Sequence, residues 1–115
     1  MLPTAHRLTD SGTFHQVVRT GRKAGSRTLV VHLAGPAAPG RAAPTVGFVV
    51  SKAVGSAVVR NRVKRRLRHL AREHLVSLPG SAVLVVRALP PAAHASYAEL
   101  RSDLGRCLAR LEVRA

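Results

Sequence analysis

The stretch Ser51–His74 reads SKAVGSAVVRNRVKRRLRHLAREH, and its pattern decides how the rest of the chain folds around it. At about 100° per residue, one arc of roughly 120° collects Val59, Val63, Leu67, Leu70, Ala71 and His74. The opposite side collects Asn61, Arg62, Arg65, Arg66, Arg68, His69 and Arg72. The stretch therefore predicts one helix with a face for a core and a face for a polyanion.

The basic side of this helix lacks acidic neighbours. The thirteen positions Arg60–Arg72 hold seven Lys or Arg and one His, and Glu73 is the only acid between Asp10 and Glu99. A solvated helix face ordinarily mixes both signs, because like charges at i,i+4 repel by about 0.2–0.5 kcal/mol per pair. The missing compensation favours nucleic-acid binding over a plain surface helix.

Length and composition set the outer bounds. The 115 residues, 46% of them apolar, fit one domain over residues 1–115. A net charge of +14 points to nucleic acid or an anionic membrane surface, and composition does not choose between them. No apolar run approaches the roughly 18 residues that span a bilayer, and the first residues lack a secretory signal pattern. A single cysteine, Cys107, fits a reducing compartment, so we expect a cytoplasmic protein with no membrane partner.

The N-terminal third predicts an arm over residues 1–8 and then a short helix. Thr9 or Asp10 can cap this helix, and Gly21 is a suitable residue for its end. Its apolar residues Phe14, Val17 and Val18 stand at i, i+3 and i+4. Phe14 reads either as a core residue or as a platform on which a base stacks, and both interpretations stay open.

Two strands are expected next. Arg22, Lys23 and Arg27 bracket Gly25 in a predicted basic turn, which either contacts phosphate or is only solvated. Residues 28–34 and 45–51 are rich in β-branched and apolar residues, and we interpret them as the two strands of a hairpin. His32 interrupts the first strand, and it reads as a satisfied residue on the wetter sheet face rather than as a ligand-binding group.

The rest of the chain predicts a crossover and a last helix. Ser56 is the expected N-cap of the basic helix, and residues 81–89 form a near-continuous apolar run typical of a strand covered on both faces and parallel to a neighbour. Ser96 and Glu99 have the spacing of a capping box. The last helix then carries one apolar stripe, formed by Leu100, Leu104, Leu108 and Leu111. Cys107 lies near this stripe, and we interpret it as a core residue rather than a nucleophile.

The residues that protein-side catalysis needs are scarce. Only five carboxylates exist, and Glu99 and Asp103, one helical turn apart, either share a cation or solvate the last helix. The six His show no metal-ligand spacing, and there is no CxxC, Walker-type or GxGxxG motif. We therefore predict no catalytic residues and no protein-bound metal, with the reacting groups supplied by another molecule.

The segment SKAVGSAVVRNRVKRRLR resembles the bacterial ribonuclease P protein subunit, whose hallmark is a basic RNR-containing helix after a strand that ends in Ser-Lys. The resemblance extends to HRL before Phe14, the LPG break and SYAEL at the last helix. It implies an α+β fold, a single-domain α/β sandwich with the order α-β-β-β-α-β-α and a left-handed βαβ crossover. It also implies an endoribonuclease holoenzyme in which a catalytic RNA and magnesium remove the 5′ leader of precursor tRNA, with no obligate protein partner.

The same resemblance assigns roles to individual positions. The residues that it places against the RNA subunit are Arg60, Asn61, Arg62, Lys64, Arg65 and Arg68. Those that it places at the leader are Phe14, Val18, His32 and Lys52. This chain departs from the family pattern at Ala53 and Ser56, and Val18 and His32 stand where the family often has aromatic residues. With less stacking, which is worth about 1–3 kcal/mol per base, leader affinity would depend more on charge.

Three other functions fit parts of this pattern. A structural RNA-binding protein such as a ribosomal protein shares the charge, and the RNA that copurifies would distinguish it. A self-sufficient nuclease would cut RNA without an RNA subunit. A DNA-binding regulator is disfavoured, because the basic helix lies within a βαβ unit rather than a helix-turn-helix.

Overall fold

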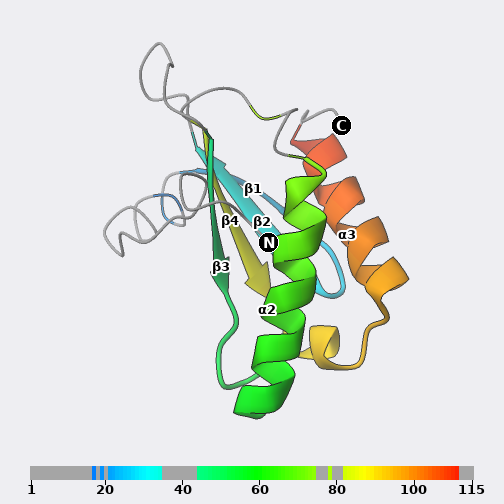
Figure 1. Ribbon diagram of the computed structural model, residues 1–115. Coiled ribbons are helices and arrows are strands. Elements are labelled where there is room, and N and C mark those ends of the chain that lie inside the picture. Colours follow the sequence, from blue (N-terminus) through cyan, green and yellow to red (C-terminus); the bar gives the residue numbers. More distant parts are fainter. Residues whose placement is uncertain are drawn as a thin grey trace.

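A four-stranded sheet carries two long helices on one of its faces (Figure 1). The computed structural model describes residues 17, 19, 21–34, 44–74, 78 and 82–111. The elements follow in the order β1 (Arg22–Gly25), β2 (Leu29–Ala34), β3 (Thr45–Val49), α2 (Ala57–Arg72), β4 (Val83–Ala88), the 3-10 helix η3 (Pro90–Ala93) and α3 (Tyr97–Arg110).

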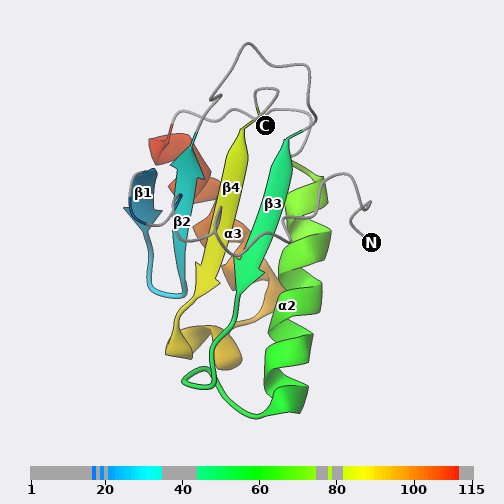
Figure 2. The same cartoon turned by 90° about the vertical axis from the view of Figure 1, so that its left-hand side faces the viewer.

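The strand order is β1-β2-β4-β3. β2 is antiparallel to both β1 and β4, whereas β3 and β4 are parallel. α2 connects the two parallel strands, which confirms the predicted βαβ unit. In Figure 2 both of their arrows point down, β4 lies to the left of β3 and α2 runs behind the sheet. That arrangement is a left-handed crossover, against the general preference for right-handed ones.

Two predictions about the strands of this sheet are wrong: one about which strands pair and one about a turn. β2 and β3 do not form a hairpin, because β4 lies between them and pairs with both. β4 is more deeply buried than β3, and the middle of the sheet is the position that covers a strand most completely. The predicted basic turn over 22–27 is instead the edge strand β1, and the chain turns only after it, where Ser26 N donates to Leu29 O at 2.8 Å.

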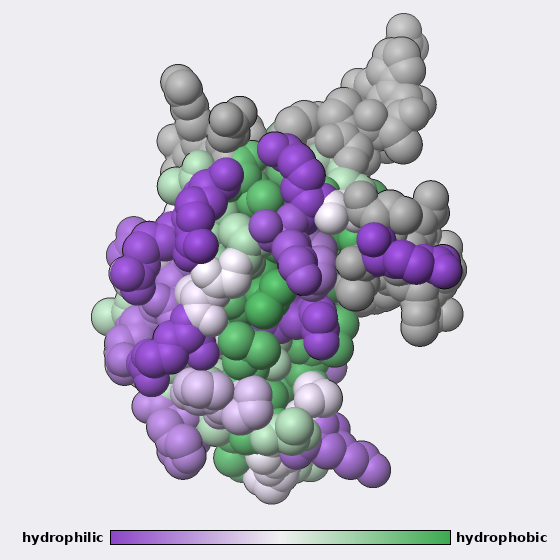
Figure 3. Space-filling view, turned by 180° about the vertical axis from the view of Figure 1, so that it is seen from behind, coloured by the Kyte–Doolittle hydropathy of each residue, from purple (hydrophilic) through white to green (hydrophobic). Residues whose placement is uncertain are grey.

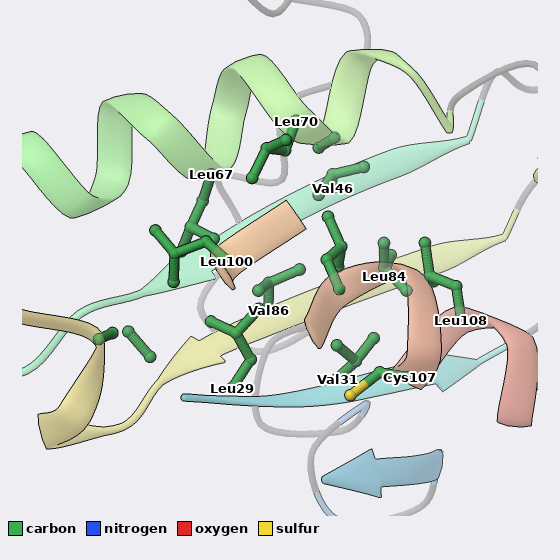
Figure 4. Close-up of a cluster of buried hydrophobic side chains, with 14 of the residues drawn as sticks. Leu29, Val31, Val46, Leu67, Leu70, Leu84, Val86, Leu100, Cys107 and Leu108 are labelled. Atoms are coloured by element: carbon green, nitrogen blue, oxygen red, sulfur yellow. The ribbon is translucent and has the colours of Figure 1, made fainter. Parts of the chain in front are cut away.

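The core lies between the sheet and the two helices. α2 packs against β3, and α3 packs against β2 and β1. α2 buries Val63, Leu67, Leu70 and Ala71, which confirms the predicted apolar face, while Val59 packs at its margin. Figure 4 shows the cluster in which these helices meet the strands, with labelled members Leu29, Val31, Val46, Leu67, Leu70, Leu84, Val86, Leu100, Cys107 and Leu108.

Both predicted helix starts are confirmed by their caps. The Val59 N–H donates to Ser56 Oγ at 3.4 Å at the start of α2. At α3, the Glu99 N–H donates to Ser96 Oγ at 3.0 Å and the Ser96 N–H donates to Glu99 Oε1 at 2.9 Å. Such caps stabilise a helix by about 1 kcal/mol each.

Most of the predicted first helix, including Phe14 and Val18, lies outside the described residues. Val17 and Arg19 are helical, and the Gly21 N–H donates to Val17 O at 2.8 Å, so this segment ends at Gly21 as expected. A Cβ at Gly21 would lie 2.6 Å from Val17 O and 2.9 Å from Leu33 O. Only glycine therefore lets the chain pass this closely from the helical segment into β1.

Candidate nucleic-acid interface

The polar face of α2 contains an open hollow. Among the described residues, its lining side chains come from this one helix: Val58, Asn61, Lys64, Arg65, Arg68 and His69. Their spacing of three, four and seven residues places them on one side, away from the four buried residues that fix the rotation of α2. Four of the six residues predicted to face an RNA subunit therefore share a single concave surface.

The cations of this hollow are available for a partner. Within the described part of the chain, Lys64, Arg65 and Arg68 make no hydrogen bond or ion pair. Arg65 and Arg68 are exposed to solvent. A set of uncompensated guanidinium groups at one-turn spacing matches the repeated negative charge of a phosphate backbone.

Arg62 and Arg66 have another role. Arg62 Nη2 donates to Ala93 O at 3.0 Å, and Arg66 Nη1 donates to Ala95 O at 3.2 Å. These carbonyls belong to η3 and to the residue before the α3 cap, so both arginines tie α2 to the start of α3. Sequence reasoning missed this role, although Arg66 lies only about 20° from the apolar residue Val59 on the helical wheel.

Arg62 therefore differs from the other residues predicted to face an RNA subunit, because it contacts the protein itself. It does not line the hollow, and Arg60 does not line it either. Arg60 is half-buried, and its Nε has no hydrogen-bond partner among the described residues. The RNR motif thus contributes only Asn61 to the concave surface, while Lys64, Arg65 and Arg68 supply its charge.

The opposite face of the sheet holds His32 among positive charges. His32 is only 2% exposed and its ring nitrogens lack partners in the described chain, so its interpretation as a satisfied residue on the wetter face is wrong. Lys23 pairs with His32 in the sheet register, and Arg87 lies diagonally across on β4. Burial, with further repulsion from Arg87 and Lys23, lowers the pKa of His32 below its usual value.

The predicted leader residues are only partly placed. Lys52 is exposed in the turn that follows β3. In the sheet register, Gly47 is the β3 residue on a level with His32, through Val85 of β4. Lys52 follows Gly47 by five residues and lies past the C-terminal end of β3, so it is not beside His32. The structure does not bring these two residues together, and Phe14 and Val18 are outside the described residues.

Each described carboxylate is bound to an arginine. Glu99 Oε2 accepts from Arg27 Nη2 at 2.7 Å, and Glu73 Oε2 lies 3.5 Å from Arg101 Nε. Asp103 accepts from Arg106 Nη2 at 2.6 Å and from Thr28 Oγ1 at 2.5 Å. It is only 4% exposed, so the predicted solvating role of Asp103 is wrong. Burial alone would raise the pKa of Asp103, but the bonds from Thr28 and Arg106 outweigh burial and lower it.

Neither a metal site nor a reactive thiol arises from the described residues. No group of three His, Cys, Asp or Glu side chains is placed to hold an ion among them. The carboxylates carry arginine partners, so this donor set does not fit magnesium, which prefers free oxygen ligands. Cys107 is buried in the core as predicted, and burial raises the pKa of its thiol.

Comparison with known proteins shows the family of this chain. The family model described as Ribonuclease P matches residues 2–112. The chain belongs to this family. The ribonuclease P protein component of Nocardioides sp. is 66% identical over 111 residues, covering 96% of this chain and 95% of the relative. That of Streptomyces avermitilis is 55% identical over 117 residues, with the same coverage.

Solved ribonuclease P proteins share the fold. The Staphylococcus aureus protein superimposes with a TM-score of 0.81 at 24% identity, covering 94% of this chain and 96% of its own. The Thermotoga maritima protein gives 0.75 at 22% identity, covering 90% and 96%. The family is the protein component of ribonuclease P, so the chain is a subunit of the ribonucleoprotein endoribonuclease that processes the 5′ end of tRNA. Neither long helix in the described ranges is apolar enough to cross a membrane.

Proposed function

We propose that this ribonuclease P protein acts as a positive scaffold for a catalytic RNA. The hollow of α2 supports this proposal most directly, because Lys64, Arg65 and Arg68 present charge that no described residue neutralises. Phosphates of the RNA subunit would supply the missing anions and release their own counterions. The partners are the ribonuclease P RNA and precursor tRNA, in the cytoplasm and without an obligate protein partner.

Bond cleavage belongs to the RNA in this proposal. A protein-side mechanism would need a tuned acid and base or a metal held by carboxylates. Here Glu73, Glu99 and Asp103 are each committed to an arginine. Magnesium would be held by RNA and substrate oxygens, and the protein would favour it indirectly by bringing phosphates together against their mutual repulsion.

The outer face of the sheet would receive the 5′ leader. Its support is the pair of exposed cations Lys23 and Arg87, which lie on this face next to the buried ring of His32. Phe14, Val18 and Lys52 complete the proposed leader set through the family resemblance. Because His32 is only 2% exposed, Phe14 alone of this set would offer a ring for stacking, and charge would contribute more than stacking to leader affinity.

Cleavage of precursor tRNA across a magnesium series tests the proposal. The RNA subunit is assayed with and without the protein, and the protein should lower the magnesium concentration at which cleavage reaches half its maximum. The physical reason is that Lys and Arg replace part of the cation that RNA–RNA contact demands. Identical magnesium dependence in both series would end the proposal.

A further inference from the structure

A second hollow lies toward the opposite edge of the sheet, between the β1–β2 turn and α3. Six of its lining residues carry the argument: Ser26, Arg27, Glu99, Asp103, Arg106 and Arg110. Figure 3 shows the face formed by β1 and α3, where long hydrophilic side chains surround a strip of apolar surface. Arg22 of the edge strand lies on the same face of the sheet as core residue Ala24 and adds one exposed cation to this side.

The arginines of this hollow are held in place. Arg110 Nη2 donates to Gly25 O at 2.5 Å, and Arg27 Nη2 donates to Glu99 Oε2 at 2.7 Å. Arg106 Nη2 bonds to Asp103, which Thr28 fixes from β2. Each contact uses one terminal nitrogen of a guanidinium that has five N–H donors. The remaining donors stay oriented at low entropic cost, which is the arrangement that favours phosphate recognition.

The solvent exposure and the positive charge of these arginines indicate that they bind an anionic ligand rather than only stabilise the fold. The side chains of Arg27 and Arg106 are 61% and 68% exposed, so their ion pairs alone contribute about 0–1 kcal/mol each. With Arg22 of β1, this surface has four cations (Arg22, Arg27, Arg106 and Arg110) against two carboxylates, of which Asp103 is buried. The exposed charge is therefore positive.

Strand order separates this hollow from that of α2. α2 packs on β3 and α3 packs on β1 and β2, and β3 and β1 are the two opposite edges of the sheet. The two hollows thus face different directions. One RNA strand that lies in the α2 hollow leaves the second surface free for another segment.

We propose that the hollow between the β1–β2 turn and α3 is a second phosphate-binding site, which takes the backbone of an RNA segment other than the one at α2. The protein then bridges two RNA segments. The inference rests on the proposed function only in that the partner is RNA. The phosphate belongs either to the ribonuclease P RNA or to precursor tRNA, and the two arms of the experiment distinguish these sources.

The test compares wild type with the double variant Arg27→Gln, Arg110→Gln, which keeps Arg106 as the partner of buried Asp103. The first arm measures the affinity of the protein for ribonuclease P RNA against salt concentration. The second arm measures the affinity of the assembled holoenzyme for precursor tRNA. In the arm whose RNA contacts this hollow, loss of two phosphate contacts should reduce the steepness of the plot of log affinity against log salt concentration by about 1.4–1.8. It should weaken binding about 30-fold near 0.1 M salt.

Two further variants keep the result interpretable. Arg101→Gln removes one charge from an exposed position of α3 outside the hollow, so its slope should change less in both arms. Glu99→Gln keeps the capping box but frees Arg27, so it should tighten binding in the arm that the double variant weakens. A purely structural cluster predicts no such gain.

The outcomes separate this inference from the proposed function. Weaker binding by the double variant in one arm supports the site and identifies its RNA, and weaker binding in both arms means that both RNAs contact the site. Wild type and double variant with equal affinities and equal slopes in both arms would overturn it, even if wild type stimulates cleavage. Failure of wild type to bind the RNA subunit would overturn the proposed function instead.

Discussion

Replacing Arg65 and Arg68 together by Ala isolates the charge of the α2 hollow. Both side chains are exposed, and neither has a hydrogen bond or ion pair with another described residue. Their removal should therefore leave the free energy of unfolding within about 0.5 kcal/mol of wild type. Any loss of RNA affinity then reports lost phosphate contacts rather than a damaged fold.

The size of the effect follows from counterion release. Each lost phosphate contact lowers the log–log slope of affinity against salt by about 0.7–0.9. Two contacts give a decrease of about 1.4–1.8, which near 0.1 M salt corresponds to about 30-fold weaker binding. At high salt the curves of wild type and variant should converge.

The assay is equilibrium binding of the protein to ribonuclease P RNA over a series of salt concentrations. Arg101→Ala serves as the control, because it removes one arginine charge from α3 outside the hollow. Parallel lines for wild type and double variant would refute the assignment of Arg65 and Arg68 to phosphate. So would a slope decrease of about 0.7–0.9 in Arg101→Ala, half that of the double variant, since it would mean that only net charge counts.

Three further outcomes follow from the described contacts. Thr28→Val removes a donor from buried Asp103 and should lower the free energy of unfolding by about 1–3 kcal/mol in urea, whereas Thr45→Val on β3 should change it little. Arg62→Ala leaves the Ala93 carbonyl without its donor and should also cost about 1–3 kcal/mol, and an unchanged urea midpoint would contradict the anchoring role. Because the pKa of His32 is lowered in the folded state, its contribution to stability is complete above about pH 6.5 and decreases as pH falls below that value. His32→Gln should therefore flatten this part of the curve of unfolding free energy against pH. A curve identical to that of wild type would argue against burial of a neutral His32.

Local signals made the helices predictable. The apolar spacing of α2 and the serines at Ser56 and Ser96 act within a few residues of one another, and all three are confirmed. Asp103 could also have been placed from spacing, because it follows Leu100 by three residues and precedes Cys107 by four. That position lies on the buried stripe of α3, where Thr28 and Arg106 satisfy the carboxylate.

Contacts between distant residues were not predictable in the same way. The β-branched and apolar residues of β2 and β3 indicate strands but not which strands pair, and β4 enters between them from much later in the chain. Likewise, nothing near Arg62 in the sequence indicates that its partner is the carbonyl of Ala93. The hollow that joins Arg27 to Arg110 also depends on how α3 settles on β1 and β2, which no local pattern encodes.

The most direct measurement of the central claim is single-turnover cleavage of one labelled precursor tRNA in three mixtures at the same low magnesium concentration. The mixtures contain the protein alone, the RNA subunit alone, and both together. A protein that supplies charge to a catalytic RNA should give the mature 5′ end quickly only when both are present. Cleavage at that position by the protein alone, or equal rates with and without it, would contradict the account.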